Sequence, residues 1–408
     1  MVGSNSEITL RETELVRLNG VLKIGDKLFL EQKNHAQQEF SFLKGDSTIS
    51  REAIEIFKSN MRHNSQEAIK NGFEYCHIIF SSKALAFRDL FEKFNISLNP
   101  IFSSYHKSDN VVYVDFDKAD YFDDDTHINP CGMLKVLDVV FSRFGLDLEL
   151  FPIYREYIGL GDLGKMAGLS PTSKQRVEGF EGFINTTDQI ERYSLSNCLK
   201  GNTGHIDYHF NPYSPLRKRL ILFGDSFFRQ HLDIFERVFS EVIYMRNPFI
   251  ITDVVNVLSP DIVLTGNAER YLVNPPKFDC SKPWFVNYLT TKFDSKRLEK
   301  RDIEAFESLF SGKNSKAFKK FMKYRMGTIS GLEENVINLT ESDLKNDVDV
   351  NLARDSAIFF EKRDLITSAY LMRLAHSKRK NSKFIKSKLE EYLLKMPDKK
   401  SRDIYDLG

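Results

Sequence analysis

The chain has 408 residues, of which 41% are hydrophobic and 28% are charged, a composition typical of globular proteins. Its 58 basic and 57 acidic residues leave a net charge of +1, so the chain as a whole has no electrostatic preference for nucleic acid. No run of about 18 uninterrupted apolar residues occurs, so we expect no membrane-spanning helix. The length predicts one large domain with a further module, or two domains.

The N-terminal segment and the cysteines indicate a compartment. No apolar run follows a basic start in the first twenty residues, so we expect no signal peptide and a cytoplasmic protein. The cysteines lack the C-x-x-C spacing of a zinc or redox motif. They predict buried, reduced thiols rather than disulfides or metal ligands, at Cys76, Cys131, Cys198 and Cys280.

Short apolar runs rich in β-branched and aromatic residues predict strands through the first 270 positions. They lie at 75–80, 111–114, 219–223, 241–245 and 261–265. Helical apolar periods follow several of them, one beginning at Phe228 and another after Asn129 and Pro130, a typical helix cap and first helical residue. Buried strands that alternate with amphipathic helices predict an α/β fold with a parallel sheet covered on both faces.

Residues 151–215 interrupt this alternation. The segment is rich in Gly, Asn, Tyr and Ser, and it predicts a loop-rich insertion that serves as a lid or binding loop. His205 and His209 are four residues apart within it, but no helix is assured there. We therefore expect polar loop residues or contacts with an acceptor molecule rather than a zinc site.

Helical patterns alone remain from about residue 294 onward, so we expect domains at 1–293 and 294–408, the second a helical module. Two clusters at 313–325 and 378–388 contain several basic residues and no acid. Such runs are usually solvated helix faces, and the alternative is a surface for an anionic polymer.

A serine follows the most apolar strand, in the stretch LILFGDSFF, where Ser226 opens a predicted helix. Gly224 permits a tight turn between the strand and the helix. Free backbone N–H groups at a helix N-terminus can stabilise an oxyanion, which suits a nucleophile. The alternative is that Asp225 or Ser226 only caps the helix.

An upstream loop, YFDDDTHINPCG at 121–132, supplies the groups that a serine nucleophile needs. Serine requires a base such as histidine, which a carboxylate orients. Asp125 and His127 are spaced so that the carboxylate can reach Nδ1 and leave Nε2 for Ser226. Asp124 gives a second usable spacing, and an acidic turn with a capping role stays open for Asp123 and Asp124.

Together these motifs resemble the SGNH hydrolase superfamily, in its alginate O-acetyltransferase-like branch. The Gly-Asp-Ser-Phe at 224–227 resembles the first SGNH block, and the Asp-Thr-His at 125–127 lies before it, as in that branch. The segments 19–30, 161–164 and 260–272 resemble its opening strand, its short Gly-Asp-Leu-Gly motif and its closing strand. Ile128 stands where that branch usually has Trp. The resemblance implies a three-layer SGNH-like domain with a permuted order of catalytic motifs.

The resemblance also implies a function, which is transfer of an acetyl group through an acyl-serine onto a hydroxyl of a bacterial capsular or other surface polysaccharide. Acetyl-CoA is the expected donor, with no bound cofactor or metal, and other polysaccharide-synthesis proteins are possible partners. A carbohydrate O-acetylesterase with the same triad and a non-catalytic polysaccharide-binding or assembly protein stay open. Possible substrate contacts are Asn267, Arg270, Tyr271, His205 and His209.

Overall fold

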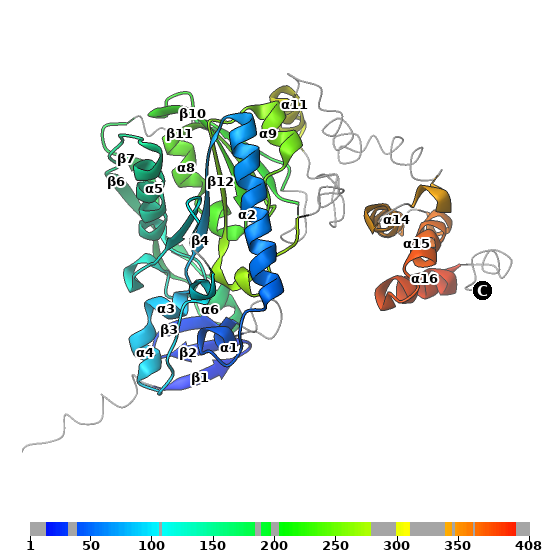
Figure 1. Ribbon diagram of the computed structural model, residues 1–408, viewed down its shortest axis with the longest axis horizontal. Coiled ribbons are helices and arrows are strands. Elements are labelled where there is room, and N and C mark those ends of the chain that lie inside the picture. The colour runs from blue at the N-terminus through cyan, green and yellow to red at the C-terminus, as the bar shows by residue number, and fades with distance from the viewer. Residues whose placement is uncertain are drawn as a thin grey trace, which may run out of the picture. The chain divides into compact units, whose positions relative to one another are not determined.

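The structure is a computed structural model that describes residues 14–31, 39–105, 108–183, 189–196, 204–278, 299–310, 339–344, 347–361 and 364–396 (Figure 1). The chain divides into two compact units. The first comprises Met1–Arg192, Tyr208–Ile250 and Ser259–Phe278, and the second Tyr193–Asp207, Ile251–Leu258 and Asp279–Gly408. The predicted domain boundary at 294, the basic cluster at 313–325, Cys198 and Cys280 lie outside the described residues.

The main sheet has seven strands in the order β5-β4-β12-β10-β11-β9-β8. In that order the strands are Val111–Val114, Glu74–Phe80, Ile262–Ala268, Leu216–Gly224, Phe239–Met245, Ile206–Phe210 and Glu191–Ser194. The pairs from β5 through β11 are all parallel. The predicted α/β fold with a parallel sheet is therefore confirmed.

The central strands form where the apolar runs were found. All residues of β4 after Glu74 are buried, as are all residues of β10 from Leu220 onward. Burial on both faces explains why these strands have continuous apolar sequences rather than an alternating pattern. In the register of β10 with β12, Gly224 lies opposite Gly266, so the segment after Gly224 emerges beside the end of β12.

Helices cover the sheet. Helix α2 (Arg51–Asn71) packs along β4, and α5 (Pro130–Phe144) lies on the other side of the central strands (Figure 1). The predicted start of α5 is confirmed, because the Asn129 side chain accepts from the Cys131 and Gly132 N–H groups and Pro130 is the first helical residue. The shorter helices that the structure describes in this unit are α1 (Glu39–Leu43), α3 (Lys83–Ala86), α4 (Arg88–Glu92), α6 (Asp162–Ala167), α7 (Ser226–Arg229), α8 (Leu232–Val238), η1 (Ile101–Ser104), η2 (Lys118–Asp120) and η4 (Glu269–Val273).

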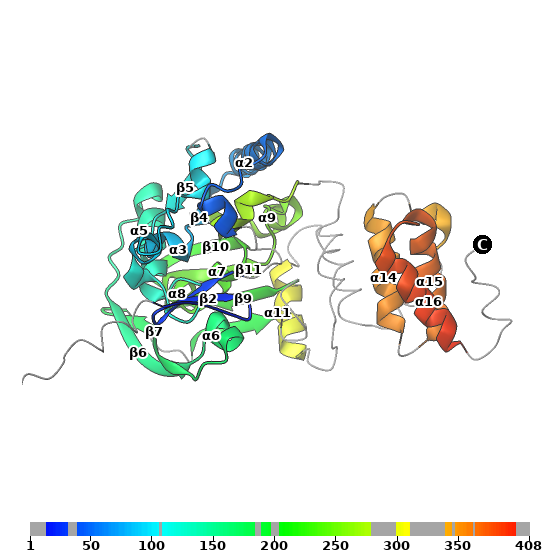
Figure 2. The ribbon, with the colours of Figure 1, turned by 90° about the horizontal axis from the view of Figure 1, so that it is seen from below.

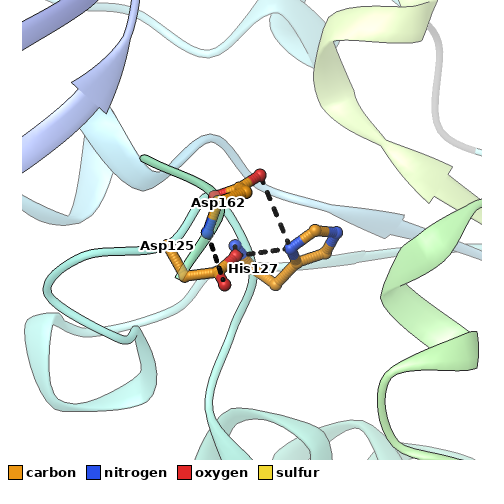
Figure 3. Close-up of side chains that lie close together, drawn as sticks. All are labelled: Asp125, His127 and Asp162. Atoms are coloured by element: carbon orange, nitrogen blue, oxygen red, sulfur yellow. Dashed lines mark hydrogen bonds and ion pairs between the residues drawn. The ribbon is translucent and has the colours of Figure 1, made fainter. Parts of the chain in front are cut away.

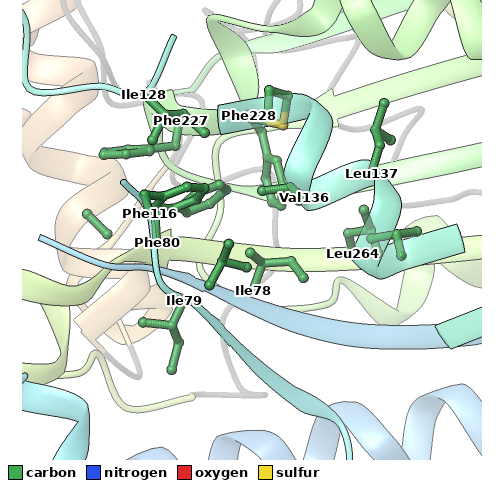
Figure 4. Packing of buried hydrophobic residues seen from close by; sticks show 14 of the residues in the cluster. Ile78, Ile79, Phe80, Phe116, Ile128, Val136, Leu137, Phe227, Phe228 and Leu264 are labelled. Atoms are coloured by element: carbon green, nitrogen blue, oxygen red, sulfur yellow. The ribbon is translucent and has the colours of Figure 1, made fainter. Parts of the chain in front are cut away.

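Aromatic side chains fill the core between β4 and the segment after β10 (Figure 4). The Phe80 ring lies 4.8 Å from the Phe227 ring and 5.3 Å from the Phe228 ring. These two phenylalanines directly follow Ser226 in the chain. Their burial therefore fixes the backbone that carries Ser226.

Residues 151–215 are not the loop-rich insertion that their composition predicted. Strands β6 (Pro152–Gly159) and β7 (Thr172–Phe180) form an antiparallel two-stranded sheet, and α6 (Asp162–Ala167) lies between them in the chain. The inner six residues of β6 are exposed, so the strand has no buried apolar run to identify it. The role of this segment as a lid stays a prediction.

A three-stranded antiparallel sheet precedes α1. Its strands are β1 (Leu15–Leu18), β2 (Val21–Ile24) and β3 (Lys27–Leu30). Val21 and Leu28 of this sheet form a small apolar cluster with Leu163 of α6. The opening motif at 19–30 therefore contacts the helix that carries the Gly-Asp-Leu-Gly motif.

The second unit is helical where it ends. Helices α14 (Asp347–Phe360), α15 (Leu365–Lys378) and α16 (Lys383–Lys395) enclose their own apolar core (Figure 2). The other helices that the structure describes in this unit are α9 (Thr252–Leu258), α11 (Lys300–Phe310) and η6 (Glu341–Asp343). The predicted helical C-terminal module is thus confirmed for these residues. No described helix has the length and apolar character needed to cross a membrane.

The basic cluster at 378–388 is partly neutralised within this module. Lys388 forms ion pairs with Glu361 and Glu391, and Lys378 Nζ lies 3.8 Å from a carboxylate oxygen of Glu341. Lys380, Lys383 and Lys386 are exposed. The choice between a solvated face and a polymer-binding surface therefore concerns those three lysines.

A buried histidine in β4 predicts how stability depends on pH. His77 is 2% exposed, its Nδ1 lies 2.7 Å from Thr265 Oγ1, and burial lowers its pKa to about 3. As pH falls below about 6.5, the unfolded chain protonates this histidine and the native chain does not, so the free energy of unfolding decreases by up to about 1.4 kcal/mol per pH unit.

We expect His77→Phe to show a shallower loss of stability between pH 6.5 and pH 5 than the wild type. Thr265 keeps a hydrogen-bond partner in this variant, because the Tyr75 hydroxyl lies 2.9 Å from its Oγ1. Urea unfolding at several pH values measures the two slopes. Equal slopes would show that His77 does not titrate differently in the native and unfolded states.

Candidate active site

Ser226 is the first residue of α7, directly beyond the carboxyl end of β10. A Cβ atom on Gly224 would lie 2.4 Å from the Gly266 carbonyl oxygen and 2.9 Å from the Phe228 ring. The close approach of β10, β12 and Phe228, rather than an unusual backbone angle, therefore requires glycine at position 224. Ligands of open α/β sheets bind at this carboxyl end.

The helix cap at this turn is Asp225. One oxygen of its carboxylate accepts from the Phe227 N–H at 2.9 Å, and the other accepts from the Ala268 N–H at 2.8 Å. The Tyr244 hydroxyl also donates to the Asp225 carbonyl oxygen at 2.9 Å. Because Asp225 is the cap, the hydroxyl of Ser226 is left for other contacts.

The Ser226 hydroxyl forms a hydrogen bond with His127. The distance from Ser226 Oγ to His127 Nε2 is 2.8 Å, and His127 Nδ1 lies 2.6 Å from Asp125 Oδ1. A carboxylate can only accept, so Nδ1 carries the proton and donates to Asp125. In the neutral imidazole Nε2 is then unprotonated and can accept the hydroxyl proton of Ser226, which is the geometry that general-base activation of a serine requires.

Burial and charge favour this arrangement. His127 is 5% exposed, Asp125 is buried and Ser226 is half-buried. Burial alone would raise the pKa of Asp125, but its hydrogen bonds and charge attraction with His127 outweigh this and hold that pKa well below its ordinary value. Asp125 is therefore ionised at neutral pH and can stabilise an imidazolium at His127.

The Gly-Asp-Leu-Gly motif holds the loop that carries Asp125 and His127. The Gly161 N–H donates to Asp124 Oδ2 at 2.7 Å, and the Gly164 N–H donates to the Asp124 carbonyl oxygen at 2.9 Å. Lys174 of β7 forms an ion pair with the other oxygen of the same carboxylate at 2.6 Å. Asp124, an alternative partner for the imidazole in the sequence, is thus an anchor of the loop.

A second carboxylate lies beside the imidazole, as Figure 3 shows. Asp162 Oδ2 is 4.0 Å from His127 Nδ1 and accepts from the Thr126 hydroxyl at 2.6 Å, while the Asp162 N–H donates to Asp125 Oδ2 at 3.2 Å. Burial and the neighbouring charge of Asp125 raise the pKa of Asp162. The sequence motif at 161–164 drew attention to this segment but did not identify the contact of Asp162 with Thr126.

Among the acidic, histidine and cysteine side chains that the structure describes, one group lies close enough together to hold a metal ion. It consists of Asp125, His127 and Asp162. In the present arrangement His127 Nδ1 bonds to Asp125, and Asp162 Oδ2 accepts from Thr126. A metal bound through Nδ1 would replace the hydrogen bond that orients the imidazole toward Ser226. The geometry therefore fits a proton relay better than a metal centre.

Lysines contact the backbone and the outer side of the same loop. Lys83, at the start of α3, donates to the carbonyl oxygens of Phe122, Asp123 and Asp125 at 2.7, 2.8 and 3.0 Å. Lys27 of β3 pairs with the Asp123 carboxylate at 2.9 Å. Neither lysine stood out in the sequence, because a single lysine after a strand carries no recognisable pattern.

The predicted substrate contacts at the end of β12 lie near the same strand ends as Ser226. Arg270 lies over the Phe227 ring at 5.9 Å and over the Tyr271 ring at 5.4 Å, and Phe227 contacts the His127 ring at 4.8 Å. The amide of Asn267 donates to the Ala268 carbonyl oxygen at 3.0 Å. Substrate binding by Arg270, Tyr271 and Asn267 stays a prediction.

The two histidines of the 151–215 segment lie in or next to a strand rather than a loop. His205 is buried and directly precedes β9, which contains His209. His209 Nδ1 lies 2.6 Å from the buried carboxylate of Glu236. His209 therefore contacts a buried carboxylate, and contacts of either histidine with an acceptor stay a prediction.

The predicted burial of the thiols holds for one of the two described cysteines. Cys76 is buried in β4, whereas Cys131 is exposed in the first turn of α5. Cys131 departs from the apolar pattern around it because it lies on the helix side that faces away from the core. Its Sγ lies 3.4 Å from the Tyr154 hydroxyl of β6.

No protein-family model matches the chain, and no curated protein sequence matches it. Among solved structures, a DHHW family protein from Eubacterium siraeum DSM 15702 is similar over 64% of this chain and 95% of its own, with 13% identity and a TM-score of 0.38. PatB1 from Bacillus cereus is similar over 64% of this chain and 97% of its own, with 10% identity and a TM-score of 0.38. The O-acetyltransferase domain of Pseudomonas putida AlgJ is similar over 63% of this chain and 94% of its own, with 15% identity and a TM-score of 0.35. All three likenesses are distant.

Gly161 contacts the loop that carries Asp124 and Asp125, and this contact predicts the effect of a small substitution. A Cβ atom on Gly161 would lie 2.1 Å from the Asp124 carbonyl oxygen and 2.8 Å from the Asp125 Cβ. We expect Gly161→Ala to displace the loop and to lower the rate of a His127-dependent reaction by about 100-fold, the cost of a shift of roughly 1 Å.

The measurement is hydrolysis of a small acetyl ester by Gly161→Ala and by Lys165→Ala, a change at an exposed position of the same helix. The Lys165 variant should react at the wild-type rate. Wild-type activity in Gly161→Ala would contradict the tight packing of the two loops.

Proposed function

We propose that this protein is a serine-dependent O-acetyltransferase that moves an acetyl group onto a hydroxyl of a bacterial surface polysaccharide, such as a capsular one. The observation that carries the proposal is the hydrogen-bond chain from Ser226 through His127 to Asp125, with distances of 2.8 and 2.6 Å. A proton relay of this kind activates serine for acyl transfer.

The first half of the reaction forms an acyl-serine. Ser226 Oγ attacks the carbonyl carbon of the acetyl donor while its proton moves to His127 Nε2, and the Asp125 carboxylate stabilises the resulting imidazolium. The oxyanion accepts a hydrogen bond from the Ser226 N–H, which has no intrahelical acceptor at the first position of α7. Collapse of the intermediate expels the leaving group, which takes the proton from Nε2.

The second half transfers the acetyl group. A sugar hydroxyl gives its proton to His127 Nε2 and attacks the acyl carbon of the acylated Ser226. The bond between that carbon and Ser226 Oγ then breaks, and Oγ regains the proton from Nε2. Water in place of the sugar hydroxyl would make the same site an esterase, so exclusion of water from the acyl-serine decides between the two reactions.

The acetyl group and the polysaccharide acceptor are supported by the resemblance of the motifs at 125–127, 161–164 and 224–227 to the alginate O-acetyltransferase-like branch. If the protein is cytoplasmic, acetyl-CoA is the donor that this proposal assigns. The acceptor would then be a polymer or precursor on the same side of the membrane.

Ser226→Ala tests the catalytic proposal. The full-length protein is incubated with acetyl-CoA and candidate polysaccharides, and both CoA release and acetyl on the polymer are measured. We expect polymer-dependent CoA release by the wild type and by Ser142→Ala, a variant of an exposed serine on α5, and none by Ser226→Ala.

The other outcomes identify the rival functions. Ser226-dependent turnover that needs no polymer and leaves none acetylated would indicate an esterase. Polymer modification that persists in Ser226→Ala would overturn the catalytic proposal and would favour a binding or assembly protein.

Two carboxylates near His127 Nδ1 allow a sharper test of its orientation. Asp125 bonds directly to Nδ1, whereas Asp162 is 4.0 Å away and bonds to Thr126. We expect Asp125→Asn to lower kcat by roughly 10⁴-fold, because an amide that donates to Nδ1 reverses the tautomer. Asp162→Asn keeps one acceptor oxygen for the Thr126 N–H, and its amide group can donate to the Thr126 hydroxyl, so it should have a much smaller effect. Equal losses in both variants would contradict the assignment of Asp125 as the orienting acid.

A further inference from the structure

Lys83 is buried beneath the loop that carries the proposed triad. The residue is 6% exposed, and its Nζ bonds to three carbonyl oxygens, those of Phe122, Asp123 and Asp125. The third oxygen belongs to Asp125, the residue whose carboxylate orients His127. The lysine and the loop come from different parts of the chain, so the three bonds tie the end of β4 to the triad.

These three acceptors require the charged form of the side chain. An ammonium has three N–H donors and no lone pair, which matches three carbonyl oxygens. A neutral amine has only two N–H donors, and its lone pair would face the third carbonyl oxygen. Loss of one proton would therefore break one bond and place two lone pairs against each other.

Burial acts in the opposite direction. It lowers the pKa of Lys83 to about 7, while the neighbouring carboxylates favour the charged form. The ammonium also lies 5.6 Å from the Phe29 ring centroid. The charged groups that face Lys83 or line the same small cavity are Asp123, Asp124, Asp125, Asp162, Glu39 and Arg270.

We propose that the Lys83 ammonium is the positioning group of the proposed triad loop, and that the site loses activity when this ammonium gives up its proton. At pH values below the pKa of Lys83, the ammonium binds all three carbonyl oxygens and Asp125 stays aligned with His127. Above it, one carbonyl is released and the loop can shift. A shift of roughly 1 Å is enough to lower the rate by about 100-fold.

Three variants test this with a small acetyl ester as substrate between pH 6 and pH 10. We expect the wild type to lose activity on the alkaline side and Lys83→Met to be about 100-fold lower in kcat across the range. Lys83→Arg, which stays protonated, should regain much of the rate and lose the alkaline decline. Lys135→Met, which removes a half-buried lysine that pairs with Asp117 and Asp120 and does not contact the carbonyl oxygens held by Lys83, should keep the wild-type profile.

A second measurement separates positioning from general stability. The proton between His127 Nδ1 and Asp125 Oδ1 should give a far-downfield proton NMR signal, because that bond is short and buried. We expect the signal to disappear in the wild type in the same pH range in which activity declines, and to persist to higher pH in Lys83→Arg. If Lys83→Met does not fold, the wild-type titration alone decides.

The outcomes distinguish this inference from the proposed function on which it rests. A signal and a rate that persist unchanged to pH 10, or a Lys83→Met variant with wild-type kcat and profile, would overturn the role of Lys83 while leaving the triad intact. Absence of any Ser226-dependent turnover would overturn the proposed function, whereas the NMR titration would still report whether Lys83 holds the loop.

Discussion

Buried backbone polar groups must find hydrogen-bond partners, and the loop at 122–127, which is buried from Asp124 to His127, meets this constraint. Lys83 donates hydrogen bonds to three of the loop's carbonyl oxygens, and the Gly164 N–H donates to the Asp124 carbonyl oxygen. The Thr126 N–H donates to Asp162 at 2.8 Å. Because these partners come from separate segments, the loop has one position in the folded unit, and that position directs His127 toward Ser226.

Ser226 owes its position to a different constraint, the close packing of two parallel strands. Glycines at 224 and 266 lie opposite each other and contact the Phe228 ring, which leaves no room for side chains at either position. The chain turns directly beyond this contact, and Asp225 binds the Phe227 and Ala268 N–H groups on both sides of the turn. The serine is therefore fixed by rigid elements rather than by a free loop, which favours accurate alignment with the base.

The sequence predicted those parts of the molecule whose pattern is local. Continuous apolar runs predicted the parallel strands, Asn129 and Pro130 predicted the start of α5, and the order of the motifs brought Asp125, His127 and Ser226 into one hypothesis. It did not predict the hairpin β6–β7, because the inner residues of β6 are exposed and form no continuous apolar run. Nor did it predict the contacts of Lys83 and Asp162, since each depends on tertiary packing between segments far apart in the chain.

The central claim is that His127 and Asp125 make Ser226 nucleophilic, and active-site titration with a fluorophosphonate tests it most directly. The reagent forms a stable bond to an activated serine and reacts slowly with ordinary hydroxyls. The account predicts one label per chain, found on the peptide that contains Ser226 and lost when His127 is replaced by alanine. Absence of labelling in the folded wild type, or a label on another serine, would contradict it.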